Sequence, residues 1–334
     1  MKKGAILGML FLLYITNGYA QQNIQFSQYI FNSLSVNPAY AGYKEEWFAQ
    51  VGLRSQWTGW KGAPKTGLLS VDGVLDPVNR RHGVGLQMIS DKLGAQTATS
   101  IYANYALRLQ LDDEDTQRLS LGVAAGVTTY GLDGSMLDPN NPNDPNLPEG
   151  MISKWKPDIR LGIYYASASW YAGVSVQDFF AGNDGNEDYV FDNLATESLY
   201  RKVNGYFMAG ALINLDQGFA LRPSLLVKDD FKGPTSLDIN AMFIFQDRLW
   251  LGGGYRTRSR IFNREYVDKS AAKLSSRNAA VAIAQFYINP RFRIGYSYDI
   301  MLNKMSGHQN GSHEVTLGVT FGKSVVKLLN PRYF

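Results

Sequence analysis

The chain of 334 residues contains no cysteine and only three histidines. Without cysteine, an exported protein has no disulfide framework, and thiolate metal or redox sites are excluded. The histidines, His82, His308 and His313, are too scattered to form a metal cluster. No spaced nucleophile and base are present either. We therefore expect no enzymatic activity, no cofactor and no metal.

Long apolar runs are also absent after the first twenty residues, which argues against a transmembrane helix. The mean hydropathy of −0.21 is typical of a soluble protein. That value is misleading if apolar residues alternate with polar ones, because transmembrane β-barrels hide their membrane signal in this alternation. Without Lys2 and Lys3 the chain has 31 basic and 29 acidic residues. This balance is too even to indicate a nucleic-acid partner.

The first twenty residues have the three parts of a secretory signal peptide. Lys2 and Lys3 form the basic start, residues 5–15 are an apolar run, and Gly18 and Ala20 are the small residues of a cleavage site. We predict that residues 1–20 are removed and that the exported chain begins at Gln21. No cysteine follows the apolar run, so lipid anchoring at this site is excluded.

An alternation of apolar and polar residues runs through most of the remaining chain. In "TSIYANYALRLQLD" (99–112), apolar side chains occupy the odd positions from 101 to 111, and Asn104, Arg108 and Gln110 lie between them. A period of two places each kind on one face of a strand. Fourteen segments predict strands at 48–57, 66–75, 82–90, 97–111, 117–130, 158–166, 169–177, 203–213, 218–228, 236–245, 249–258, 278–288, 292–301 and 313–322. The alternation is less clean at 203–213 and 278–288, which have apolar residues on both faces.

The connections between these segments sort by parity. Every even-numbered connection is short, and the longest connections, 131–157, 178–202 and 259–277, are all odd-numbered. Short periplasmic turns and long extracellular loops give this asymmetry in a transmembrane barrel. Such a barrel must close, because lipid cannot hydrogen-bond the backbone groups of a free strand edge. We predict an all-β, closed antiparallel barrel of about 14 strands over residues 47–322. Residues 21–46 would be a periplasmic lead-in and residues 323–334 a periplasmic tail.

Aromatic and basic residues near the strand ends suggest two further features. Six aromatic residues are expected to form girdles at the membrane interfaces: Trp47, Trp57, Tyr130, Trp155, Trp170 and Trp250. Four arginines are expected at the barrel rim, where they either remain solvated or hold an acidic partner or lipopolysaccharide phosphates: Arg256, Arg258, Arg260 and Arg264. The loop "LDPNNPNDPNLPEG" (137–150) has calcium-compatible oxygens, although its prolines already specify a rigid loop.

The flanks of the barrel carry a more specific pattern. The segment "QNIQFSQYIFNSLSVNPAYAG" (22–42) closely resembles the amino-terminal signature of the PorP/SprF family, through residues 27–29, Phe31-Asn32 and Asn37 to Gly42. Further matches are "GVGLQMISDKLG" (83–94), residues 143–167, "NGSHEVTLGVTFG" (310–322) and the ending "NPRYF" (330–334). The resemblance covers essentially the whole exported chain.

This resemblance implies a non-enzymatic outer-membrane component of type IX protein secretion or gliding motility. Such a component supports the secretion or surface attachment of cargo adhesins and contacts periplasmic machinery. We expect membrane lipid around the barrel, cargo at loops 131–157, 178–202 and 259–277, and periplasmic components at both chain ends. The expected partner-binding residues are Asn37, Pro38, Tyr40, Gly42, Arg256, Arg258, Arg260, Asn330, Pro331 and Phe334. The alternative is a diffusion channel or transporter for small solutes.

Overall fold

The computed structural model describes residues 24, 26–137, 148, 150–180, 190–191, 194–195, 203–231, 234–259 and 277–322. The predicted signal peptide (1–20) and carboxyl-terminal tail (323–334) lie outside these residues. No helix within the described ranges is both long enough and apolar enough to cross a membrane.

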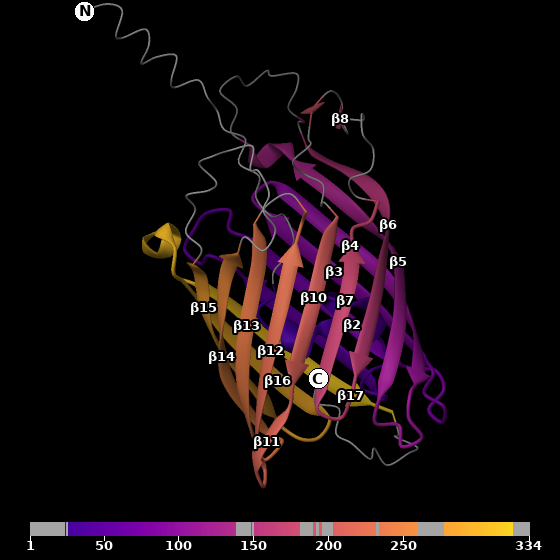
Figure 1. Cartoon of the computed structure of the whole chain (residues 1–334). Coiled ribbons are helices and arrows are strands. Elements are labelled where there is room, and N and C mark those ends of the chain that lie inside the picture. Colours follow the sequence, from indigo (N-terminus) through magenta and orange to yellow (C-terminus); the bar gives the residue numbers. More distant parts are fainter. Residues whose placement is uncertain are drawn as a thin grey trace, which may run out of the picture.

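Fourteen antiparallel strands form a closed barrel, as the alternation predicts (Figure 1). β10 and β11 are two halves of one strand interrupted at Leu212, and both pair with β12. The strands are β1 (Trp47–Ser55), β2 (Lys65–Val74), β3 (His82–Leu93), β4 (Gln96–Gln110), β5 (Arg118–Asp133), β6 (Met151–Ala166), β7 (Trp170–Gln177), β10 (Asn204–Ala211), β11 (Ile213–Asp216), β12 (Phe219–Asp229), β13 (Thr235–Phe245), β14 (Leu249–Ser259), β15 (Arg277–Tyr287), β16 (Phe292–Met301) and β17 (Ser312–Phe321).

The barrel closes because its first and last strands pair with each other. β1 and β17 align from Trp47 opposite Phe321 to Ser55 opposite His313. Each strand also pairs with its neighbours in the chain, so within the described residues the ring of strands has no break. Closure removes the free edges that hydrocarbon cannot solvate.

One strand differs clearly from its predicted bounds. β6 begins at Met151, seven residues before the expected start at 158, and β5 continues to Asp133. Pro157 suggests a loop, but its missing N–H costs no ladder bond here. The Phe179 N–H donates to the Ile159 carbonyl, so odd-numbered β6 residues direct their backbone groups toward β7. Pairing with β7 begins only at Leu161. Pro157 lies before this paired region, where a strand tolerates proline because no N–H is needed.

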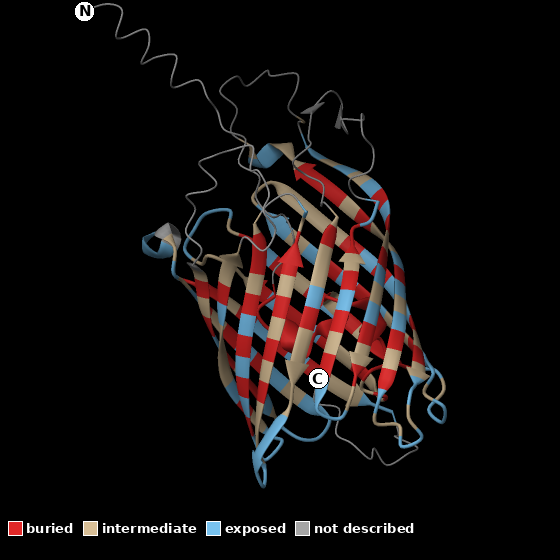
Figure 2. Cartoon of the chain, viewed as in Figure 1, coloured by how far each residue is buried: buried red, intermediate tan, exposed pale blue. Residues whose placement is uncertain are grey.

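Exposure alternates along the strands, which Figure 2 shows as bands of colour. In β4 the odd positions point outward, with Ile101 and Tyr105 exposed, while Asn104 and Arg108 are buried inside as expected. The girdle prediction needs two corrections, because Tyr130 and Trp250 are only 3% exposed. Both occupy the inward parity of their strands, so they pack in the lumen and cannot lie at a membrane interface.

The two ends of the barrel differ. At one end, here called the long-loop end, the strands are joined through residues 56–64, 134–150, 178–203, 230–234, 260–276 and 302–311, together with the tight turn at 94–95. The other, the short-turn end, carries residues 75–81, 111–117, 167–169, 217–218, 246–248 and 288–291. The expected loop 178–202 contains the short pair β8 (Val190–Phe191) and β9 (Leu194–Ala195).

Candidate functional site: the plugged lumen

Residues 26–43, here called the plug, fill the lumen of the barrel. Three 3-10 turns shape the plug: η2 (Tyr29–Phe31), η3 (Ser33–Ser35) and η4 (Pro38–Tyr40). Its large apolar side chains pack with inward-facing barrel residues in one core cluster: Tyr29, Ile30, Phe31, Leu34, Val36, Tyr40 and Tyr43. This corrects the expected periplasmic position of residues 21–46, whose described part lies inside the barrel. In the periplasm, these side chains would be exposed to water.

Asn37 fastens the middle of the plug to the barrel wall. Its Nδ2 donates to the carbonyl oxygens of Ile163 (2.9 Å) and Val174 (3.1 Å), which belong to β6 and β7. Its Oδ1 accepts from the Ala39 N–H at 2.9 Å and thereby caps η4, which begins at Pro38. Proline suits this first helical position because it needs no N–H partner there. The Asn-Pro pair therefore has a structural role at this point.

Inward-facing glycines let the plug backbone reach the wall. A Cβ on Gly122 would lie 2.1 Å from the Ala39 nitrogen, and one on Gly162 would lie 2.0 Å from Asn37 Oδ1. On β3, a Cβ on Gly83 would lie 2.0 Å from the Ala41 carbonyl oxygen. Side chains cannot approach this closely, so the short "NPAYAG" segment and three separate strands fit each other only because these positions are glycine.

We expect Gly122→Ala to destabilise the protein, because the added methyl group must push the plug away from β5. Overpacking of this kind costs about 1–3 kcal/mol. Gly67→Ala is the matched control, since its Cβ would meet only a Leu53 methyl group at 3.9 Å. Urea unfolding in detergent micelles measures both variants. Equal unfolding midpoints for the two variants would contradict the close packing.

Polar wall residues bind the plug through its backbone carbonyls. Both terminal nitrogens of Arg222 donate to the Ile30 carbonyl at 3.2 Å, and Arg293 donates to the Phe31 carbonyl at 3.2 Å. Ser175 Oγ and Gln177 Nε2 both donate to the Val36 carbonyl at 2.6 Å. The plug pairs with no strand, so these side chains satisfy backbone groups that a ladder would otherwise satisfy.

A buried ion cluster, here called the upper cluster, holds the plug near the long-loop end. Its six charges balance: Arg54, Lys228, Arg256, Asp238, Asp299 and Glu314. Arg54 contacts Asp299 at 2.6 Å and Glu314 at 3.0 Å. The Ser27 N–H donates to Glu314 at 2.8 Å, and the Ser27 hydroxyl lies 2.7 Å from Asp299. Each acid is therefore compensated, as burial requires.

A second cluster, here called the lower cluster, lies between the end of the plug and the short-turn end of the barrel. Glu45 contacts Arg80 at 2.7 Å and Arg108 at 3.0 Å, and Asp115 contacts Arg80 at 2.6 Å. Arg108 and Arg118 both donate to the Arg80 carbonyl. The cluster thus joins the end of the plug segment to turns 75–81 and 111–117.

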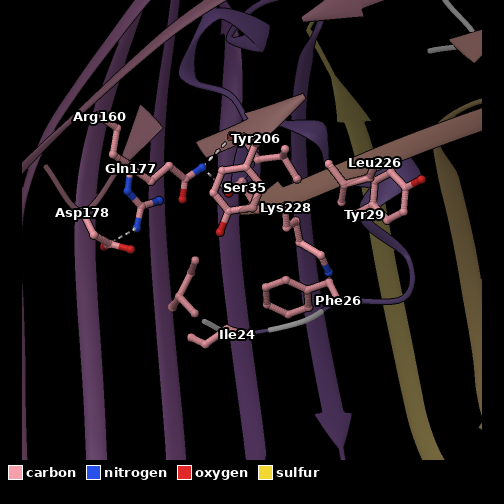
Figure 3. A pocket seen from close by; sticks show the side chains of 12 residues that line it. Ile24, Phe26, Tyr29, Ser35, Arg160, Gln177, Asp178, Tyr206, Leu226 and Lys228 are labelled. Carbon is pink, nitrogen blue, oxygen red and sulfur yellow. Dashed lines mark hydrogen bonds and ion pairs between the residues drawn. The ribbon is translucent and has the colours of Figure 1, made fainter. Parts of the chain in front are cut away.

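A small cavity lies beside the plug toward the long-loop end (Figure 3). Its volume is about 40 Å³, enough for ordered water but not for a solute-sized ligand. Ile24, Phe26 and Tyr29 of the amino-terminal segment face Arg160 and Lys228 of the wall across it. Among the described residues, no group of three or more metal-ligating side chains could hold an ion.

The expected partner-binding residues separate into three groups. Asn37, Pro38, Tyr40 and Gly42 are brought together, but as buried parts of the plug segment rather than at a surface. Arg256 belongs to the upper cluster and not to the rim, because it is 6% exposed and occupies the inward parity of β14; Arg258 is partly buried on the same strand. The third group lies outside the described residues: Arg260, Asn330, Pro331 and Phe334.

Several solved structures resemble this chain at low sequence identity. Solved structures similar to this chain include the monoaromatic hydrocarbon channel CymD, with 10% identity, a TM-score of 0.49 and coverage of 92% of this chain and 96% of that one. A FadL homologue of Pseudomonas aeruginosa has 11% identity, a TM-score of 0.46 and coverage of 90% and 95%. Omp33 of Acinetobacter baumannii has 9% identity, a TM-score of 0.45 and coverage of 84% of this chain and 100% of that one. Sequence identities and TM-scores this low do not indicate a shared substrate.

No curated protein matches the sequence. A family model described as "Type IX secretion system membrane protein PorP/SprF" matches residues 18–319. Together with the closed barrel and its apolar outer surface, this match places the protein in the outer membrane of a Gram-negative bacterium. The chain belongs to the PorP/SprF family of type IX secretion system membrane proteins.

Proposed function

We propose that this protein is a non-enzymatic scaffold of type IX secretion or gliding, and that it supports the secretion or surface attachment of cargo adhesins. The plugged lumen is the observation that carries the proposal. Seven large apolar plug side chains are buried against the wall, and exposing each of the four that are not tyrosine costs about 1.5–3 kcal/mol. A barrel closed in this way is suited to present its two faces to partners rather than to conduct solutes.

The two ends of the barrel would have separate functions. Outer-membrane barrels carry short turns in the periplasm and longer loops outside. The long-loop end would therefore meet cargo, through residues 134–150, 178–203 and 260–276. The short-turn end would meet periplasmic components, through its turns and the tail 323–334. The lower cluster supports the second role, because it holds the turns 75–81 and 111–117 rigidly against the plug segment.

Photo-crosslinking in the native bacterium tests this division. Lys61 is exposed in the long-loop segment 56–64, and Asp113 is exposed in the short turn 111–117. A photoreactive residue at position 61 should crosslink to secreted proteins, and one at position 113 to periplasmic secretion components. Deleting the gene should remove specific proteins from the cell surface, and the wild-type gene should restore them. An unchanged set of surface proteins after deletion would refute the scaffold.

Conductance of the purified protein in liposomes tests the alternative channel function. We expect no current through the full chain, because the plug, the upper cluster and the lower cluster occupy the lumen. An open, solute-selective current from the unmodified protein would favour the channel over the scaffold.

A further inference from the structure

The plug runs through the lumen in one direction, from the long-loop end to the short-turn end. At its start, Ser27 and Gln28 bind Glu314, the third residue of β17 after the long-loop segment 302–311. Two residues after its end, Glu45 binds Arg80 in the short turn 75–81, and β1 then begins at Trp47. The segment therefore enters from the long-loop mouth and descends.

Ile24 and Phe26, around the start of the plug, support this direction. Ile24 lines the cavity of Figure 3 together with Asp178, which directly follows β7 at the long-loop end, and Lys228, the penultimate residue of β12. Phe26 packs with Leu68 and Ile89 of β2 and β3, and Ile24 packs against this group. Ile24 therefore lies at the mouth of the lumen toward the long loops.

The filled lumen leaves no return path to the periplasm. Below Ile24, the plug and the wall are in close contact, with Ser27, Gln28, Tyr29 and Ile30 each at most 3% exposed. A second stretch of chain could not pass between them. The chain therefore enters the lumen at Ile24 from the long-loop side.

We propose that the amino terminus of the processed chain is presented at the outer mouth of the barrel. It is then an additional outer element beside the long loops, available to a secreted polypeptide and not to periplasmic components. The proposal rests on the orientation used in the proposed function, with the long loops outside. It assigns the two chain ends to opposite sides of the membrane, because β17 ends at the short-turn end.

Single-cysteine labelling tests the proposal, and the absence of native cysteine makes each introduced thiol unique. The reporter is Gln22→Cys, two residues ahead of Ile24. Lys61→Cys in segment 56–64 is the outer reference, and Asp113→Cys in turn 111–117 is the inner reference. Both reference side chains are exposed, so neither change disturbs packing. The probe is a polymer-linked maleimide too large to pass through porins, applied to intact and to permeabilised cells.

We expect Gln22→Cys to label in intact cells to the same extent as Lys61→Cys, and Asp113→Cys to label only after permeabilisation. A Gln22→Cys variant that labels only in permeabilised cells, or in neither condition, would overturn the proposal. If Lys61→Cys were the inaccessible one, the orientation itself would be wrong and the proposal would fall with it. Loss of secretion plays no part in this readout, so the proposal can fail while the scaffold function stands.

Discussion

Deleting residues 24–43 is expected to convert the closed barrel into an ion-conducting pore. The plug contributes no strand, so the ring of backbone hydrogen bonds stays intact without it. An eight-stranded barrel is just wide enough to be filled by its own side chains, and the diameter grows with strand number. Fourteen strands therefore leave a lumen that here is filled by the plug. Single-channel recording in planar bilayers should show steady current for the deletion variant and none for the full chain.

A covalent lock provides the matched control for this experiment. A Cβ on Gly162 would lie 3.0 Å from Asn37 Cγ, close to the roughly 3 Å that separates Cβ from the far sulfur in a disulfide. Because Asn37→Cys removes the Oδ1 that a Cβ at position 162 would meet, the double variant Asn37→Cys with Gly162→Cys should form this bond and remain closed when oxidised. Heat-modifiable migration on gels checks that each barrel is folded. A folded deletion variant without current would mean that wall side chains alone close the lumen.

The strands were predictable because each repeats one simple constraint. A strand between lipid and lumen must alternate, and the turns between strands carry Asp, Asn, Pro or Gly, so boundaries agree within a few residues at most positions. β6 is the clearest exception. Its alternation continues through "MISKWKPD" (151–158), but Pro157 is read from sequence as a break unless the register toward β7 is known.

The plug was not predictable from the same rules. Its turns span only three residues each, and "YIFNSLSV" (29–36) has neither a helical nor a strand period. Its position depends on contacts with residues more than a hundred positions away, such as those between Asn37 and β6 or β7. The sequence does place Arg54, Arg222 and Asp238 at strand positions that face the lumen. Charged residues fit both a water-filled pore and a lumen with charged partners, so this placement does not reveal the plug.

The upper cluster shows the same ambiguity. Arg256 was read as a rim residue because it precedes a long loop, yet its Nε lies 2.8 Å from Asp238 inside the barrel. The alternation along each strand shows that such residues face the lumen. It does not give their partners, because Arg54, Arg256, Asp238 and Asp299 come from four strands spread across the chain.

Arg54→Met is expected to cause the largest loss of stability among single substitutions in the upper cluster. It leaves the carboxylates of Asp299 and Glu314, both 1% exposed, without their main partner. Removing one member of a buried ion pair costs about 3–5 kcal/mol, because the charge that remains is neither solvated nor compensated. Urea unfolding in detergent micelles, followed by tryptophan fluorescence, measures the loss. Arg291→Met is the control, since Arg291 is exposed in turn 288–291 and its loss should change stability by at most about 0.5 kcal/mol.

A second substitution separates the lost charge balance from the lost packing. Glu314→Gln removes one of the two stranded carboxylates, so we expect the double variant with Arg54→Met to be less destabilised than the two single effects added together. Strict additivity would show that Arg54 and Glu314 act independently, which their 3.0 Å contact does not allow. Because the Ser27 and Gln28 N–H groups also bind Glu314, loosening this cluster should release the start of the plug before the barrel unfolds. Protease cleavage near residue 27 at urea concentrations below the unfolding midpoint should therefore appear in Arg54→Met and not in Arg291→Met.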